Sequence, residues 1–244
     1  MATATRPDAS GSLTEPLPTP PLLPLENGDR LTRDEFERRY DAMPDLKKAE
    51  LIEGIVYMGS PVKFRGHSQP HFDVIGWLSH YQAGTPGVAG GDNGSLRLDL
   101  DNMPQPDAFL IVEPAHGGQA EISGDDYVVG APELVAEVAS SSVSYDLHGK
   151  LRVYRRNGVR EYVVWRVKDR AILWFVLRGA GFEPLAQDAA GYFRSEVFPG
   201  LWLDPSALIR GDLAAAFRVV QQGLATPEHA AFVARLPKAA PPAP

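Results

Sequence analysis

Two acidic residues in this chain stand where carboxylates favour metal chemistry. Asp107 follows Gln105 and Pro106 at the head of one apolar run, and Glu137 lies near the end of another, Glu133–Val138. A carboxylate inside a mostly apolar strand is costly to bury unless it is paired or binds a metal. If the two runs are neighbouring strands, their carboxylates can together hold a divalent ion. A glutamate on an edge strand facing solvent would give a similar pattern at Glu137.

A lysine follows these acids. Asp146 and Lys150 are four residues apart in a segment that we expect to be helical. Residues at this spacing share a helix face, so a surface ion pair worth about 0.3–0.5 kcal/mol would also explain them. Because this segment follows the strand that carries Glu137, Lys150 is a candidate for stabilising negative charge on a reacting phosphate. Glu50, at the start of an earlier expected strand, is either a third acid at the metal or a surface residue.

Other patterns favour structural roles. His67 and His71 suggest a two-histidine zinc site, but Pro70 lies between them and no third ligand stands nearby. The serines at 140–142 are typical of a connection from strand to helix, because the Gly-x-Ser-x-Gly elbow of a nucleophile is missing. The glycines at 90–94 lack the Lys-Ser/Thr pair of a phosphate-binding loop.

Composition narrows the class of protein. The 244 residues are 44% hydrophobic and 23% charged, as is ordinary for a soluble globular protein. The absence of cysteine excludes disulfides and thiolate metal sites, so any metal must bind oxygen or imidazole. No run approaches the roughly 18 apolar residues of a membrane span, and no secretory signal is evident. We therefore expect a cytoplasmic protein without a membrane partner.

The net charge of −7 hides a segregation along the chain. Residues 148–170 carry eight basic side chains against two acidic ones, whereas residues 92–126 carry eight acids against one arginine. A basic segment beside an acidic one fits a metal pocket flanked by a phosphate-facing surface. The candidates for phosphate contact are Arg152, Arg155, Arg156 and Arg160. A solvated arginine face on a helix would look the same.

The ends of the chain differ from its middle. Residues 1–30 are rich in proline and lack apolar periodicity, and residues 237–244 are similar, so we predict disordered tails there. Between them we predict one domain, residues 31–236. Thr32 and Glu35 form a capping box and Leu31 with Phe36 a hydrophobic staple, which places a helix start at the domain's beginning.

Hydrophobic periodicity predicts alternating strands and helices in this domain. After the first helix, which ends near Met43, helices are expected at about Pro70–Tyr81, Ser144–Asn157, Pro205–Gln221 and Pro227–Leu236; Phe72, Ile75, Leu78 and Tyr81 should share the apolar face of the one that begins at Pro70. The expected strands are two within Glu50–Met58, then Leu96–Leu100, Asp107–Val112, Glu133–Val138, Glu161–Val167 and Ala171–Leu177, with shorter ones near Phe182–Leu185 and Tyr192–Val197. This order indicates an α/β fold.

The motifs together resemble a known family. They are Glu50-Leu-Ile-Glu-Gly54, His67, Gln105-Pro-Asp107, Gly130-Ala-Pro-Glu-Leu-Val135, Glu137-Val-x-Ser140, Asp146-x-x-x-Lys150, Tyr154 and Gly158-Val-Arg-Glu-Tyr162. Over about residues 31–210 the chain is similar to the Uma family of bacterial restriction endonucleases, within the PD-(D/E)XK nuclease superfamily. The resemblance implies a restriction-endonuclease-like core, with a mixed central β-sheet flanked by helices, and magnesium-dependent cleavage of DNA.

Carried over by position, the resemblance assigns roles to individual residues. Asp107 would be the aspartate of the PD half and Glu137 the acid of the second half, with the main-chain carbonyl of Val138 as a further metal ligand. Ala139 stands where the lysine of the Glu-x-Lys pattern would be, and Lys150 would replace it. A match to an additional helper acid falls on Glu50.

The expected function is therefore metal-dependent endonucleolytic hydrolysis of DNA, with Mg²⁺ as cofactor and Mn²⁺ as a possible substitute. A homodimer would suit a double-strand cutter, because two-fold symmetry matches the paired scissile bonds. The alternative is a catalytically inactive module of the same fold that binds nucleic acid or protein, which the acidic net charge and Ala139 favour. Hydrolysis of another phosphoester is a third reading.

Overall fold

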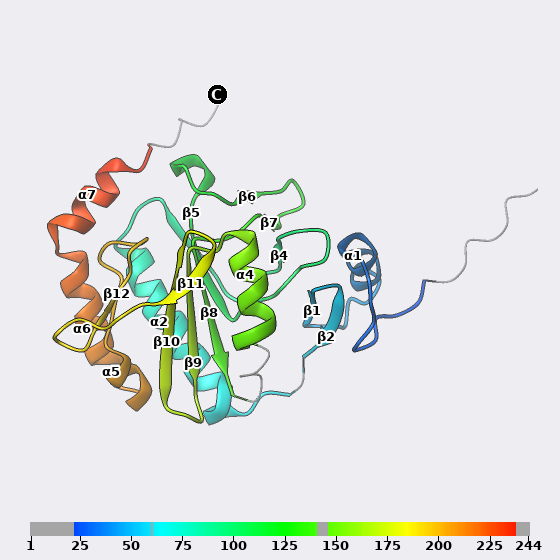
Figure 1. Ribbon diagram of the computed structural model, residues 1–244, viewed down its shortest axis with the longest axis horizontal. Coiled ribbons are helices and arrows are strands. Elements are labelled where there is room, and N and C mark those ends of the chain that lie inside the picture. The colour runs from blue at the N-terminus through cyan, green and yellow to red at the C-terminus, as the bar shows by residue number, and fades with distance from the viewer. Residues whose placement is uncertain (1–21, 60, 141–145, 238–244) are drawn as a thin grey trace, which may run out of the picture.

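The centre of the protein is a six-stranded mixed sheet (Figure 1). The computed structural model describes residues 22–59, 61–140 and 146–237. The strands run in the spatial order β11 (Gly181–Pro184), β10 (Ala171–Arg178), β9 (Glu161–Arg166), β8 (Leu134–Ala139), β5 (Ala108–Val112) and β3 (Val88–Gly91). β8 and β9 are parallel, and the other neighbours are antiparallel. The predicted mixed sheet is confirmed.

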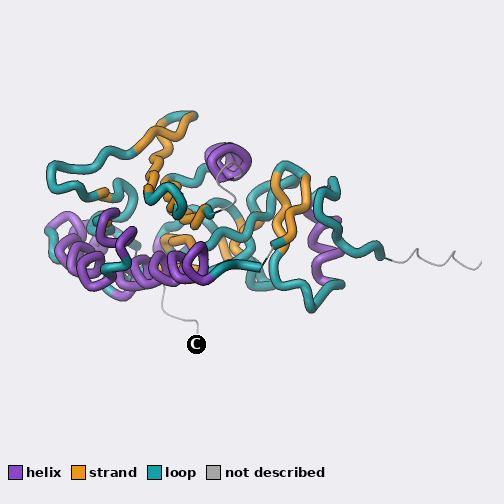
Figure 2. Tube along the Cα trace, turned by 90° about the horizontal axis from the view of Figure 1, so that it is seen from below, coloured by secondary structure: helices purple, strands orange, loops and turns teal. Residues whose placement is uncertain are grey.

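Helices cover both faces of this sheet (Figure 2). On one face lie α2 (Gln69–Ala83), α5 (Pro205–Arg210) and α6 (Leu213–Leu224), with α7 (Pro227–Arg235) beside them. On the other face lies α4 (Leu151–Asn157), which follows the π-helical turn η3 (Asp146–Lys150) and connects β8 to β9. The parallel pair requires such a crossover connection.

The alternation of side chains along β8 decides which face Glu137 belongs to. Leu134, Ala136 and Val138 pack into the core beneath α2, α5 and α6. Val135 and Ala139 pack into the core beneath α4. Because successive side chains on a strand point to opposite faces, Glu137 shares the α4 face.

The segment before the sheet forms a small lobe at one side of it (Figure 1). The lobe consists of α1 (Arg33–Asp41) and the hairpin of β1 (Ala49–Ile52) and β2 (Ile55–Met58), around its own apolar cluster. The predicted helix start is confirmed, since Thr32 Oγ1 accepts a hydrogen bond of 3.4 Å from the Glu35 amide. The hairpin turn occurs at Glu53-Gly54, both with positive φ.

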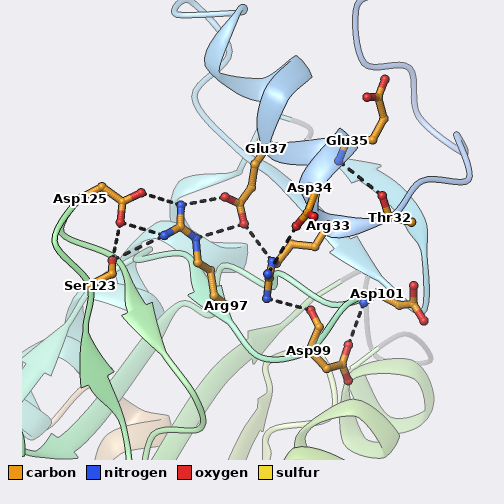
Figure 3. Close-up of polar contacts among 10 residues, drawn as sticks. All are labelled: Thr32, Arg33, Asp34, Glu35, Glu37, Arg97, Asp99, Asp101, Ser123 and Asp125. Carbon is orange, nitrogen blue, oxygen red and sulfur yellow. Dashed lines mark hydrogen bonds and ion pairs between the residues drawn. The ribbon is translucent and has the colours of Figure 1, made fainter.

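An arginine ties the lobe to the rest of the protein (Figure 3). Arg97 lies on β4 (Leu96–Arg97), next to β7 (Val128–Val129), which in turn pairs with β6 (Glu121–Ile122). Its guanidinium bonds to both carboxylate oxygens of Glu37 on α1, at 3.1 and 2.7 Å, and to both of Asp125, at 2.8 Å each. Bidentate pairs of this kind fix orientation. They hold the lobe, and with it β1, against the sheet domain.

Several predicted boundaries were wrong. The predicted N-terminal tail is too long, because Leu25 is buried in the cluster of the lobe and the amide of Gly28 donates to Val56. Residues 1–21 and 238–244, which make up most of the two predicted tails, lie outside the described residues. Strand β4 stops at Arg97 instead of Leu100.

The helices also differ in detail from the prediction. The expected helix Pro205–Gln221 is two helices, because Gly211 takes a left-handed conformation that ends α5 and Asp212 caps α6. Phe72 does not join the apolar face of α2, and its side chain is 72% exposed. Residues 141–145, where the predicted third helix begins, lie outside the described part.

Two further short strands lie outside the central sheet. β12 (Phe193–Arg194) pairs with β13 (Trp202–Leu203), and a 3₁₀ turn, η2 (Pro114–His116), follows β5. Within the described ranges, none of the helices has the length and apolar character that crossing a bilayer requires.

Candidate active site

Asp107 and Glu137 lie side by side where β5 begins. In the antiparallel register Ala108 faces Ala136, so the residue before β5 comes next to Glu137 on β8. The amide of Asp107 donates to Glu137 Oε2 at 3.4 Å, and the amide of Val138 donates to Asp107 Oδ2 at 2.8 Å. The two side chains are 3% and 4% exposed. The structure thus brings together the two acids that the sequence singled out.

Lys150 reaches the same place from the end of η3. Its Nζ lies 2.8 Å from Glu137 Oε1 and 2.8 Å from Glu50 Oε1. The hydroxyl of Tyr154 on α4 also donates to Glu137 Oε1, at 2.9 Å, and the amide of Gln105 donates to Glu50 Oε1 at 2.8 Å. Lys150, Glu50 and Glu137 are all buried, so their charges depend on this mutual pairing.

The position of Ala139 explains how a lysine from another segment can reach Glu137. Ala139 follows Glu137 by two residues, on the same face of β8, and its methyl group is fully buried in the core beneath α4. Leu147 and Leu151, from the segment that also carries Lys150, pack against that core. The small side chain at 139 therefore leaves this face to the incoming segment, which supplies the lysine.

Two basic residues at Asp107 were missed by sequence reasoning. Lys48, just before β1, places Nζ 3.4 Å from Asp107 Oδ1 and 2.9 Å from Asn93 Oδ1. His67 places Nε2 3.3 Å from Asp107 Oδ2. His67 belongs to the motifs that carried the family resemblance, which was a signal for a site residue. Lys48 gave no such signal, although it stands two residues before Glu50.

The histidines His67 and His71, for which the sequence offered no third zinc ligand, both lie beside Asp107. His71 Nε2 lies 2.7 Å from the main-chain oxygen of Asp107 and 3.1 Å from Asp92 Oδ1. The rings of His67 and His71 are 5.6 Å apart and both meet Asp107. Among the residues that the structure describes, no three histidine and acidic side chains cluster closely enough to hold a metal by themselves.

The surroundings of Asp107 keep its carboxylate charged. Burial by itself would raise the pKa of Asp107. The hydrogen bond from His67 and the positive charges of Lys48, His67 and Lys150 outweigh burial and lower that pKa well below its usual value. Burial and the neighbouring Glu137 raise the pKa of Tyr154 well above its usual value, so its hydroxyl stays protonated and donates.

These groups line a pocket of about 700 Å³. Asp107, Glu137, Val138, Lys150 and Glu50 contribute to its wall. The lobe adds an apolar side made of Leu46, Tyr57 and Met58, together with Lys47 and Lys48, and Val62 extends this side in the connection that follows β2. The site therefore forms between the lobe and the sheet, with charged groups from both.

The four predicted phosphate-binding arginines lie apart from this pocket. Arg152 pairs with Glu53 at 2.8 Å, and Arg156 pairs with Asp99 at 3.2 Å. Arg160 donates to the side chain of Gln119 at 2.7 Å, and Arg155 is exposed. None of the four is among the described residues that line the pocket. Their contact with phosphate stays a prediction.

Comparison with known proteins identifies the family and the fold of the chain. The family model Uma2, described as "Putative restriction endonuclease", matches residues 33–206. The chain belongs to the Uma2 family. A crystal structure from Anabaena variabilis ATCC 29413, titled as that of "a putative nuclease belonging to DUF820", is similar with a TM-score of 0.50 and 14% identity. The similarity covers 73% of this protein and 99% of the Anabaena chain, and it shows that the two share a fold. No curated protein matches the sequence.

Proposed function

We propose that this protein is a metal-dependent endonuclease that hydrolyses phosphodiester bonds in DNA. One observation carries the proposal: two buried carboxylates from adjacent strands, Asp107 and Glu137, meet a buried lysine at a pocket wide enough for a nucleotide. The Uma2 family description supports nuclease chemistry. Glu50 and Tyr154 would hold the lysine and Glu137 in place through the bonds described above.

The donor set fits a hard divalent cation. Asp107 and Glu137 offer carboxylate oxygens, and Asp107 is held in its ionised form. Mg²⁺ keeps several of its waters and needs only one or two carboxylates from a protein, so these two acids and the carbonyl of Val138 would suffice. Mn²⁺ prefers similar ligands. When bound, such an ion supplies a water of lowered pKa and a Lewis acid.

The residues of the chain itself would perform the remaining steps. Lys150, held between Glu50 and Glu137, would orient the attacking water or stabilise negative charge on the phosphate. Lys48, on the lobe, lies 3.4 Å from Asp107 and would attract the same anion. A charge that is already in position before the reaction needs no reorganisation during it.

The second candidate function is that of a catalytically inactive binding module, and the hydrogen bonds at Asp107 and Glu137 favour it. Asp107 already accepts from Lys48, His67 and the amide of Val138. Glu137 accepts from Lys150 and other donors. Because a buried carboxylate with enough donors is stable without a metal, this arrangement would also suit a protein that uses the fold only for binding.

Cleavage of supercoiled plasmid in Mg²⁺, in Mn²⁺ and in EDTA tests the proposal. The matched variants are Glu137→Gln, which keeps the shape of the side chain, and Glu121→Gln on the exposed strand β6. We expect metal-dependent nicking by the wild-type protein and Glu121→Gln, and none by Glu137→Gln. A folded wild-type protein that neither nicks DNA nor melts at a higher temperature with either metal would support the inactive binding module instead.

The same proposal predicts where the protein acts and in which oligomeric state. An endonuclease of this kind would act on DNA in the cytoplasm, and a homodimer would match the two strands of a duplex. Sedimentation of the protein with and without duplex DNA would show whether it is a dimer.

A further inference from the structure

The connection from the lobe to α2 exposes large apolar side chains beside the pocket. It comprises the residues from 61 onward that lead through the π-helical turn η1 (Phe64–Ser68) into α2. Val62 and Phe64 are 62% and 67% exposed, and Phe72, in the first turn of α2, is also exposed. We call residues 62–72 the rim segment.

The rim segment is in contact with the catalytic groups. Val62 lines the pocket, and His67 meets the carboxylate of Asp107. A Cβ on Gly66 would lie 3.4 Å from the hydroxyl of Ser140, directly after β8. Figure 1 shows the chain passing from β2 to the start of α2 in this region. A molecule bound in the pocket would therefore lie beside Val62 and within reach of its neighbours.

Large exposed apolar side chains are concentrated in the rim segment. Six large hydrophobic side chains are exposed in the described part of the chain, and three of them, including both aromatic ones, belong to the rim segment. Leaving a phenylalanine in water forgoes roughly 1.5–3 kcal/mol of burial energy. Exposed apolar groups gathered at one place commonly mark a binding surface.

Charge indicates what this surface binds. Lys63 and Arg65 flank Phe64, both are exposed, and neither has an ion-pair partner within the described ranges. Arg97 and Arg152, in contrast, are paired with acids. Lys47 and Lys48 add positive charge at the lobe side of the pocket. An aromatic ring between free cations suits a strand with negative phosphates and flat bases, because base stacking and phosphate contacts then act together.

We propose that the rim segment docks a DNA strand that has an unstacked base. Phe64 stacks on that base, and Lys63 and Arg65 contact the flanking phosphates. This inference rests on the proposed function and narrows its substrate to DNA whose bases leave the stack readily, such as single strands and mismatched duplexes.

Binding without cleavage tests the stacking contact. The full-length protein in EDTA is titrated against a fluorescent single strand of about 20 nucleotides, the same strand in a perfect duplex, and a duplex with one mismatch. Phe64→Ala and Phe64→Leu should weaken single-strand and mismatch binding about tenfold or more, and Phe64→Trp should retain it. Perfect duplex should be affected less. Leu100→Ala, equally exposed but outside the rim segment and not among the residues that line the pocket, is the matched control and should change nothing.

The salt dependence tests the phosphate contacts. Lys63→Ala and Arg65→Ala should each lower the slope of log affinity against log salt by about 0.7 for a single strand. Arg235→Ala, exposed on α7, should leave the slope unchanged.

The outcomes separate this inference from the proposed function. Unchanged single-strand binding by Phe64→Ala, or no DNA binding by the wild-type protein, would overturn the inference even if plasmid is cleaved. Binding that depends on Phe64 would sustain it even if no cleavage occurs. If Phe64→Ala loses only binding to phosphatidylserine vesicles and binds DNA normally, the rim segment is a membrane contact and the inference is wrong.

Discussion

Replacing Lys150 by methionine should reveal what holds the buried charges of the site together. The Lys150 ammonium lies 2.8 Å from a carboxylate oxygen of each of two buried acids, Glu50 and Glu137. At an effective dielectric constant of about 20, each such pair attracts with roughly 6 kcal/mol. Desolvation of the three charges cancels much of this gain, and removing one partner of a buried pair costs about 3–5 kcal/mol. Methionine fills similar space, so the loss should reflect charge and not a cavity.

The expected loss is large compared with the stability of a typical domain, which is about 5–15 kcal/mol. Urea unfolding at pH 7 in EDTA should show Lys150→Met destabilised by about 3–5 kcal/mol. Lys47→Met is the matched control, since Lys47 is exposed at the same pocket, and it should lose less than about 1 kcal/mol. Adding Glu50→Gln to Lys150→Met should recover part of the loss, because the amide still accepts from Gln105 without a buried charge.

The same variant separates a catalytic lysine from a structural one. Cleavage per folded molecule should fall at least about 100-fold, as when a group that stabilises charge in the transition state is removed. A folded Lys150→Met protein that cleaves plasmid as fast as the wild type would refute a catalytic role. A stability change within about 1 kcal/mol would refute the electrostatic reasoning as well.

Three further predictions concern the metal, pH and the lobe. Asp107→Asn should abolish the metal-induced rise in melting temperature, which for the wild-type protein should correspond to about 2.7 kcal/mol at a metal concentration one hundred times Kd. Burial raises the pKa of Glu161 from 4.5 to about 7, so between these pH values the folded state binds a proton that the unfolded state has lost. The free energy of unfolding should therefore fall by about 3 kcal/mol as pH rises from 4.5 through 7. Glu161→Gln should lack this fall in urea titrations across that range. Arg97→Met should cost about 2 kcal/mol and make the lobe more sensitive to limited proteolysis, while an equal rate of digestion in both proteins would show that Arg97 does not hold the lobe.

Local patterns in the sequence predicted the framework of the site. An acid at the head of one apolar run and an acid near the end of another marked Asp107 and Glu137, and these runs are the adjacent strands β5 and β8. The helical segment after β8 marked Lys150, which the structure brings to Glu137. Such features are readable because the burial of a strand and the spacing of a helix face depend on residues close together in the chain. The order of the motifs was also sufficient to indicate the family, which the match over residues 33–206 shows.

Only the tertiary structure decided which cations surround Asp107 and which side chains face solvent. Lys48 is 59 residues from Asp107 in sequence and reaches it through the packing of the lobe. The apolar periodicity of α2 predicted a buried Phe72, but the sheet and α6 cover another face of that helix, and Phe72 is exposed. Contacts between distant segments leave no period in the sequence, since they depend on how the lobe, the sheet and the connection between them pack. The amino-acid sequence by itself therefore indicated the acids of the site and five of the six strands of the central sheet, all but β3, and the docking of the lobe decided the charge balance and the exposed rim of the pocket.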